Sequence, residues 1–186
     1  MKQLIQLSRP FPAKFIKTNP SGGGSYVAHD IVTQRLLQVV GAFDFHIVQV
    51  IRGDVAEIPP NPDGKSDRAK KGAPALHDVV VGVVAALTIT VDGRPFTVQE
   101  SGDCESPHNW PHDGARMKDA CSDAIKRCAM RFGCGLHLWS QEKYYLHDAL
   151  TRDHPEAAKA AEADPREQIE QPTLGAAVDA KQAVPA

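Results

Sequence analysis

The stretch Asp119-Ala-Cys-Ser-Asp-Ala-Ile-Lys-Arg-Cys-Ala-Met-Arg-Phe-Gly133 predicts a single amphipathic helix. At about 100° per residue, the apolar side chains fall on one arc, made of Met117, Cys121, Ala124, Ile125, Cys128 and Phe132. The charged side chains lie on the other side and comprise Arg116, Asp123, Lys126, Arg127 and Arg131. Gly133 is a typical stop signal, so we expect the helix to run over about 114–132. Such a helix can bury one face and hold a polyanion on the other, although a charged outer face is more often simply solvated.

The segments before this helix predict the rest of the fold. Helical spacing of apolar residues indicates a helix over about 28–40, and β-type composition indicates strands over about 45–52, 78–91 and 94–100. Asp92-Gly93 is a two-residue hairpin signal, since a type I′ turn needs φ > 0 at both central positions. The order helix, strand, hairpin, helix predicts an α+β fold, with an antiparallel sheet packed on the long helix.

Less regular segments separate and flank these elements. We expect local strand or coil over 1–25, a Pro/Gly-rich loop over 56–77, and a short helix within 133–146. The loop carries four cations, Lys65, Arg68, Lys70 and Lys71, which either contact a second strand or only solubilise the loop. Residues 151–186 contain almost no large apolar side chains. We therefore expect one domain over 1–150 and a disordered acidic tail over 151–186, apart from a nascent helix near 155–163.

The charge balance excludes a generally basic nucleic-acid binder. The 186-residue chain has a formal net charge of −2, so any cationic site must be local. No apolar stretch approaches the roughly 20 residues that span a bilayer, and we expect no signal peptide because the first residues lack a long apolar run. Four cysteines without a secretory signal suggest reduced thiols and a cytoplasmic protein.

Three segments resemble the Rad52 family of single-strand annealing proteins over about residues 7–148. The long helix is similar to the signature helix of that family at Lys118, Ala120, Ser122, Asp123, Lys126, Arg127, Phe132 and Gly133. Residues 20–27, Pro-Ser-Gly-Gly-Gly-Ser-Tyr-Val, resemble the glycine-rich segment before its first helix. Residues 40–45, Val-Gly-Ala-Phe-Asp-Phe, resemble its helix-to-strand junction.

The resemblance implies where DNA would bind. Lys126 and Arg127 match the paired basic residues of the family's DNA-binding groove, and Lys17 is the nearest basic candidate beside the glycine-rich segment. Family members often carry another Arg one turn later, where this chain has Met130, and Arg131 is displaced by one position. The spacing also allows Asp123 to pair with Arg127 at i, i+4. Further candidates, for which ordinary surface charge is the competing interpretation, are Arg116, Arg35, Arg52 and Lys118.

The resemblance also implies an activity. A β-β-β-α unit of bacterial or phage type would assemble into an oligomeric ring or arc, bind single-stranded DNA and anneal complementary strands in recombination and repair. Pairing of the bases drives annealing, so we expect no ATP, no cofactor, no resident metal and no catalytic residue. The acidic tail could recruit a recombination or single-strand-binding protein, and we expect no membrane partner.

Other functions remain as alternatives. A scaffold could bind DNA ends or recruit a recombinase without annealing strands. A metal-dependent nuclease could use Asp103, Glu105, Asp113 and His108. Cys104, His108 and His112 form a weak metal motif, and no Cys-x₂-Cys pair is present to strengthen it. Gly64-Lys65-Ser66 imitates the end of a phosphate-binding loop, but Pro59 stands where that loop requires glycine.

Overall fold

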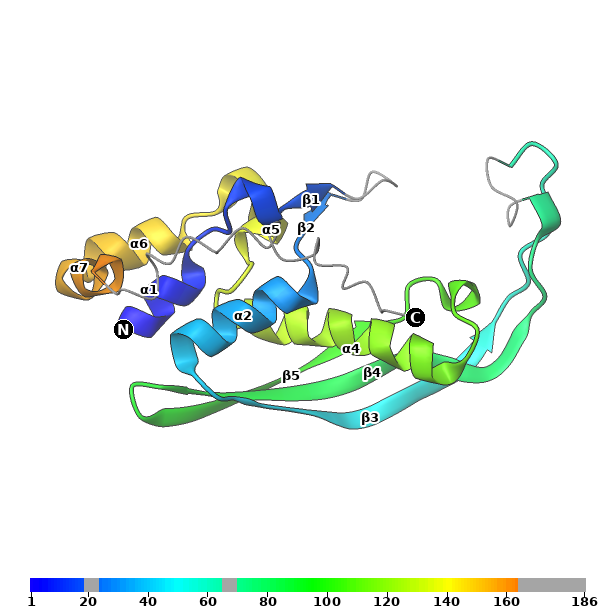
Figure 1. Ribbon diagram of the computed structural model, residues 1–186, viewed down its shortest axis with the longest axis horizontal. Helices are drawn as coiled ribbons and strands as arrows, with labels where there is room; N and C mark the ends of the chain where they lie inside the picture. Colours follow the sequence, from blue (N-terminus) through cyan, green and yellow to red (C-terminus); the bar gives the residue numbers. More distant parts are fainter. Residues whose placement is uncertain (19–23, 65–69, 164–186) are drawn as a thin grey trace, which may run out of the picture.

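The computed structural model describes residues 1–18, 24–64 and 70–163 (Figure 1). Its centre is a three-stranded antiparallel sheet in the order β3-β4-β5, with strands β3 (Asp44–Val55), β4 (Leu76–Val91) and β5 (Arg94–Asp103). Several helices lie on one face of this sheet (Figure 1). The α+β class with an antiparallel sheet is therefore confirmed.

The hairpin between β4 and β5 forms where the sequence predicts it. Asp92 and Gly93 adopt φ values of 50° and 77°, as a type I′ turn requires. The turn sets the register, which pairs Val91 with Arg94 and Thr88 with Thr97. The two threonine hydroxyls share a hydrogen bond of 2.8 Å. β3 and β4 extend beyond β5 as a two-stranded arm that leads to the loop after β3 (Figure 1).

The predicted long helix is α4 (Asp113–Met130), and it lies along the sheet against β4 and β5. Its buried positions toward the sheet are mostly small: Ala120, Ala124, Cys128 and Ala129. The sheet contributes every second residue of β4, including Val83, Ala85, Leu87 and Ile89. Small helix residues allow close approach, which is tightest at Gly102, where a Cβ would lie only 2.8 Å from Ala124 Cα and still closer to Ala120 O.

Helix α2 (His29–Val40) closes the main core beside α4. Val32, Leu36 and Val39 are buried in that core. The segment before α2 contains strands β1 (Lys17–Thr18) and β2 (Ser25–Tyr26), which pair as a small antiparallel ribbon. A single turn of 3-10 helix (Ala13–Phe15) precedes it.

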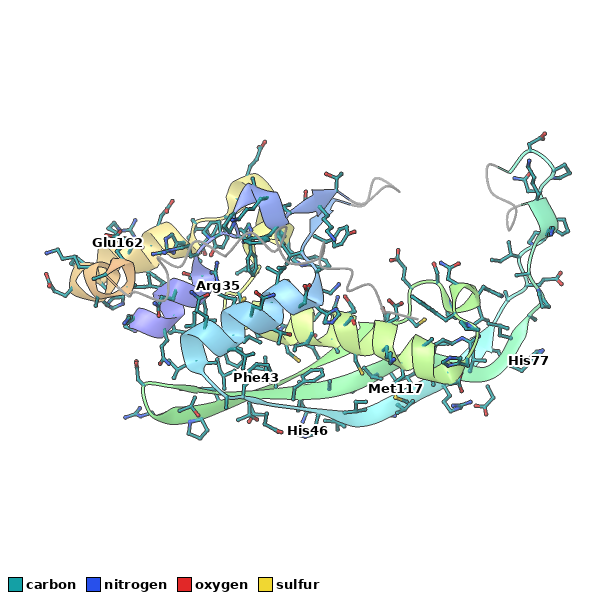
Figure 2. The ribbon with its side chains drawn as sticks, viewed as in Figure 1. Arg35, Phe43, His46, His77, Met117 and Glu162 are labelled. Carbon is teal, nitrogen blue, oxygen red and sulfur yellow. The ribbon has the colours of Figure 1, made fainter. Side chains whose placement is uncertain are left out.

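The N-terminus differs from the expected strand or coil, because residues Lys2–Ser8 form helix α1. Seven residues are too few for a helix that is stable alone, so neighbouring elements must stabilise it. Leu7 is buried in the main core, and Ile5 packs against Ala158 and Ala161. Arg35, labelled in Figure 2 where α1 and α2 lie beside each other, donates to Gln6 O at 2.9 Å.

Short helices follow α4 and continue past residue 150, where the domain boundary is expected. Helix α5 (His137–Ser140) and a 3-10 turn (Gln141–Lys143) are followed by α6 (Leu146–Asp153) and α7 (Pro155–Glu162). Residue 151, where the expected disordered tail begins, lies inside α6, and α7 covers the nascent helix expected near 155–163. Their alanines are small enough to pack on α1, so large apolar residues are not needed. Residues 164–186 lie outside the described residues.

No helix in the described part of the chain combines the length and the apolar character needed to cross a membrane.

Candidate nucleic-acid interface

A groove of about 960 Å³ runs along α4 and contains both residues of the Lys-Arg pair. Lys126 and Arg127 form one wall, and Ser25 and Tyr26 of β2 form another. Trp139 of α5 lines the same groove. The structure thus brings the signature helix, the segment after the glycines and the segment after α4 together around one concave surface.

Lys126 is a half-buried cation at the wall of this groove. Its Nζ lies 3.5 Å from Asp123 Oδ1, one turn earlier on α4, and 32% of its side chain is exposed. Asp123 in turn accepts a hydrogen bond from the backbone N–H of Asp103 at 3.4 Å. The aspartate therefore links the helix to the end of β5 and orients Lys126 along the groove.

Arg127 has a different partner from the one that its sequence spacing suggests. Its Nε lies 4.0 Å from Glu100 Oε2 on β5, and its guanidinium carbon lies 6.0 Å from the centre of the Trp139 ring. The Nε is buried and has no hydrogen-bond partner among the described residues. The expected Asp123–Arg127 pair is thus replaced by Asp123–Lys126 and Glu100–Arg127, because α4 packs against β5, which carries Glu100.

The lining of the groove is not uniformly cationic. Four carboxylates accompany the two cations, namely Asp103, Glu105, Asp119 and Asp123. Carboxylates repel phosphate, so the contribution of charge to the affinity of one protomer for DNA must be modest. A strand held here needs contacts besides phosphate neutralisation, or several protomers in a row.

Two of the other predicted DNA-binding residues are exposed near α4. Arg131 pairs with Glu100 and is 66% exposed, but it lines a separate hollow with Arg94 and Phe96 rather than the groove. Lys118 is exposed nearer the start of α4 and does not line the groove.

Lys17 lies close to the groove through the β1–β2 ribbon. It is directly opposite Tyr26 in the ladder, and opposite residues of an antiparallel pair have neighbouring side chains. Lys17 is exposed. It therefore adds a third cation beside Tyr26, which lines the groove.

The remaining three predicted arginines have partners within the protein. Arg35 is buried, donates to the carbonyls of Gln6 and Arg9 at 2.9 and 3.2 Å, and lies over the ring of Phe11. The expected surface charge at position 35 is therefore an internal tie between α1 and α2. Every residue has a backbone carbonyl, so the sequence pattern could not reveal that Arg35 is bonded inside the protein.

Arg116 and Arg52 meet at Asp113, the first residue of α4. Arg116 is buried and donates to Asp113 Oδ1 at 3.0 Å and to the carbonyls of Pro107 and Trp110. Arg52 pairs with Asp113 at 2.9 Å and with Asp78. A hydrogen bond from the Val80 amide, together with both guanidiniums, lowers the pKa of the Asp113 carboxyl. These arginines organise the junction of α4 with the sheet rather than the groove.

Most residues of the metal and nuclease alternatives have other partners, whereas Asp103 and Glu105 line the groove. Burial, with nearby Asp119, raises the pKa of the Cys104 thiol to about 11, which disfavours the thiolate that binds metal. His108 bonds to Pro74 O, and His112 accepts from the Ala115 amide as the cap of α4. Among the described residues, no three His, Cys, Asp or Glu side chains are grouped so that they could hold a metal ion.

The basic loop is described only in part. Lys70 and Lys71 are exposed near the far end of the β3–β4 arm, whereas Lys65, Ser66 and Arg68 lie outside the described residues. The role of the loop as a second contact stays a prediction.

Sequence reasoning missed the aromatic part of this site. Tyr26 and Trp139 were only visible as members of poorly defined segments, and neither has a motif that marks an exposed aromatic side chain. Aromatic side chains beside the cationic face of a helix would indicate a nucleic-acid site. The sequence does not show, however, that Tyr26 and Trp139 lie beside the cationic face of α4.

The comparison with protein families identifies a family for this chain. A family described as Rad52/22 family double-strand break repair protein matches residues 2–157, which is most of the chain. No curated protein matches the sequence significantly.

Proposed function

The chain belongs to the Rad52/22 family of double-strand break repair proteins, and on that premise we propose that it binds single-stranded DNA and anneals complementary strands without ATP. Membership supports a role in DNA repair and recombination, and annealing is the activity at the level of the family. The observation that carries the proposal for this chain is the groove in which Lys126 and Arg127 lie side by side with Trp139 and Tyr26.

The physical basis is electrostatic and independent of sequence. Lysine and arginine neutralise phosphates and release condensed counterions, which gives affinity for any single strand. A strand gripped mainly by its backbone leaves base edges free to test a second strand. Base pairing then supplies the free energy, so the protein needs no hydrolysable nucleotide and no catalytic group.

Assembly follows from the small number of cations in each groove. Two cations offset by carboxylates give weak binding per protomer, and a row of grooves multiplies weak contacts through effective concentration. β3 is an edge strand of the three-stranded sheet and exposes Ile47, Val48 and Val50. Exposed apolar residues on an unpaired edge favour contact with another chain. We therefore propose a ring or an arc of identical protomers, in keeping with a family whose members oligomerise.

The decisive experiment follows annealing directly. Two complementary oligonucleotides, one with a donor dye and one with an acceptor, are mixed with the purified protein in the absence of nucleotide and divalent metal. We expect faster duplex formation than in the protein-free mixture, with unchanged rates when ATP or Mg²⁺ is added.

Three outcomes would contradict the proposal. Binding without any acceleration would favour the end-binding or recruiting scaffold. Acceleration that requires ATP would contradict the proposed driving force. Degradation of the oligonucleotides only when divalent metal is present would favour a nuclease, despite the absence of a metal-holding group among the described residues.

A further inference from the structure

Trp139 is the most conspicuous unexplained side chain of the groove, since 63% of it is exposed. Tryptophan has the largest apolar surface of any residue and is usually well buried in a folded chain. Here it lies in a four-residue helix beside two cations. Its exposure costs free energy in the isolated protomer, so a ligand that covers the ring would recover that cost.

The backbone that carries Trp139 is held firmly in place. Gly133 and Gly135 adopt positive φ values of 87° and 80° and turn the chain after α4. Leu138 then packs against the main core, and His137 Nε2 accepts a hydrogen bond of 3.2 Å from the Phe11 amide. The two residues before Trp139 are thus anchored, which places the backbone of Trp139 beside the groove.

The immediate surroundings of the ring suit a nucleobase. Arg127 lies 6.0 Å from the ring centre, within the range of a cation–π contact. A smaller hollow joins Trp139 with Tyr26, Lys126 and Met130, so an aromatic ring, a cation and an apolar surface meet there. Proteins that bind single strands without sequence preference combine such aromatic surfaces with cations that follow the backbone.

We propose that Trp139 is a stacking platform for a base of the single strand whose phosphates contact Lys126 and Arg127. This inference rests on the proposed function, and it adds the part of the nucleotide that the groove recognises. It also explains how a groove with four carboxylates among its lining residues retains affinity, because stacking does not depend on net charge.

The first test uses the two tryptophans of the chain as separate reporters. Trp110→Phe leaves Trp139 as the sole tryptophan, and Trp139→Phe leaves Trp110. Trp110 donates to Asp119 and does not line the groove. On titration with oligo(dT), we expect strong quenching of fluorescence in Trp110→Phe protein and little change in Trp139→Phe protein. Equal quenching in the two would overturn the proposal.

The second test separates stacking from phosphate binding. Trp139→Ala should bind oligo(dT) at least about fivefold more weakly, the lower end for loss of one stacked base, whereas Trp139→Phe should stay within about twofold of the unchanged protein. An abasic phosphodiester strand of equal length should bind all three proteins alike. The Lys126→Ala/Arg127→Ala protein should lose affinity for both polymers.

The outcomes distinguish this inference from the proposed function. If Trp139→Ala binds oligo(dT) as tightly as the unchanged protein, or loses the abasic strand equally, the stacking role is wrong while DNA binding stands. If Trp139→Ala sediments as a smaller assembly, the indole side chain lies between protomers and the proposal fails. If the unchanged protein binds neither polymer, the proposed function itself is wrong.

Discussion

Replacing both Lys126 and Arg127 by alanine should change how binding to single-stranded DNA responds to salt. Both side chains line the groove and are about one-third exposed, so each can reach a phosphate while remaining anchored to α4. The apolar face of α4 is untouched by the change. We therefore expect the variant to fold and assemble normally.

The magnitude follows from the number of cations in the groove. Each phosphate neutralised on a single strand contributes about 0.7 to the slope of log affinity against log salt, so losing two contacts should flatten the slope by about 1.4 per bound protomer. Between 50 and 200 mM salt, that difference corresponds to about sevenfold in affinity. The unchanged protein should lose about seven times more affinity than the variant over this range.

The measurement is fluorescence anisotropy of labelled oligonucleotides at several salt concentrations. Oligo(dT), oligo(dA) and a mixed sequence should give the same change of slope, because phosphate contacts carry no sequence information. The matched control is Arg152→Ala/Lys159→Ala, which removes two exposed cations from α6 and α7. The control should keep the original slope.

Two results would refute this reasoning. A double variant with the same slope as the unchanged protein would show that these side chains do not contact phosphate. A control that flattens the slope equally would show that only overall charge matters. The groove would then not be the DNA-binding site.

Three further predictions concern the framework around the groove. Gly102→Ala should destabilise the protein by about 3 kcal/mol or more, because its Cβ would collide with the backbone of α4; a normal midpoint in urea unfolding would contradict the close approach. Arg35→Met should cost roughly 3 kcal/mol, since it removes two charged hydrogen bonds between α1 and α2; hydrogen exchange should show faster opening of α1, and unchanged protection would argue against the tie. Asp113→Asn should destabilise the protein at pH 7, and the difference should shrink as the pH falls below 3.8. The folded-state pKa of Asp113 lies below its ordinary 3.8, so its contribution is complete above that value and is lost as the pH falls through the lowered pKa. An unfolding difference that stays constant with pH would contradict this role.

The sequence predicted those elements whose stability is local or strongly periodic. α4 was placed within two residues at each end because 18 residues repeat one apolar face, and the β4–β5 hairpin followed from Asp92-Gly93. α1 was missed because its seven residues depend on α2 and α7, which are distant in sequence.

The candidate site was predictable only in part, for a physical reason. Lys126 and Arg127 could be identified from their helix face and from a family resemblance. Arg35 and Arg116 resembled surface cations, since their partners are mainly backbone carbonyls that any residue can supply. Trp139 could not be placed, because whether a tryptophan is exposed depends on how the chain turns at two glycines.

Glu100 has a consequence for the exchange between protein and DNA partners. Its carboxylate is held by Arg127 and by Arg131 at once, while only 12% of its side chain is open to solvent. If a phosphate drew Arg127 away, Arg131 would still neutralise the glutamate, so no lone negative charge would be left in a poorly hydrated position. The second arginine would thus let the proposed capture of a strand be reversed at little free-energy cost to the fold.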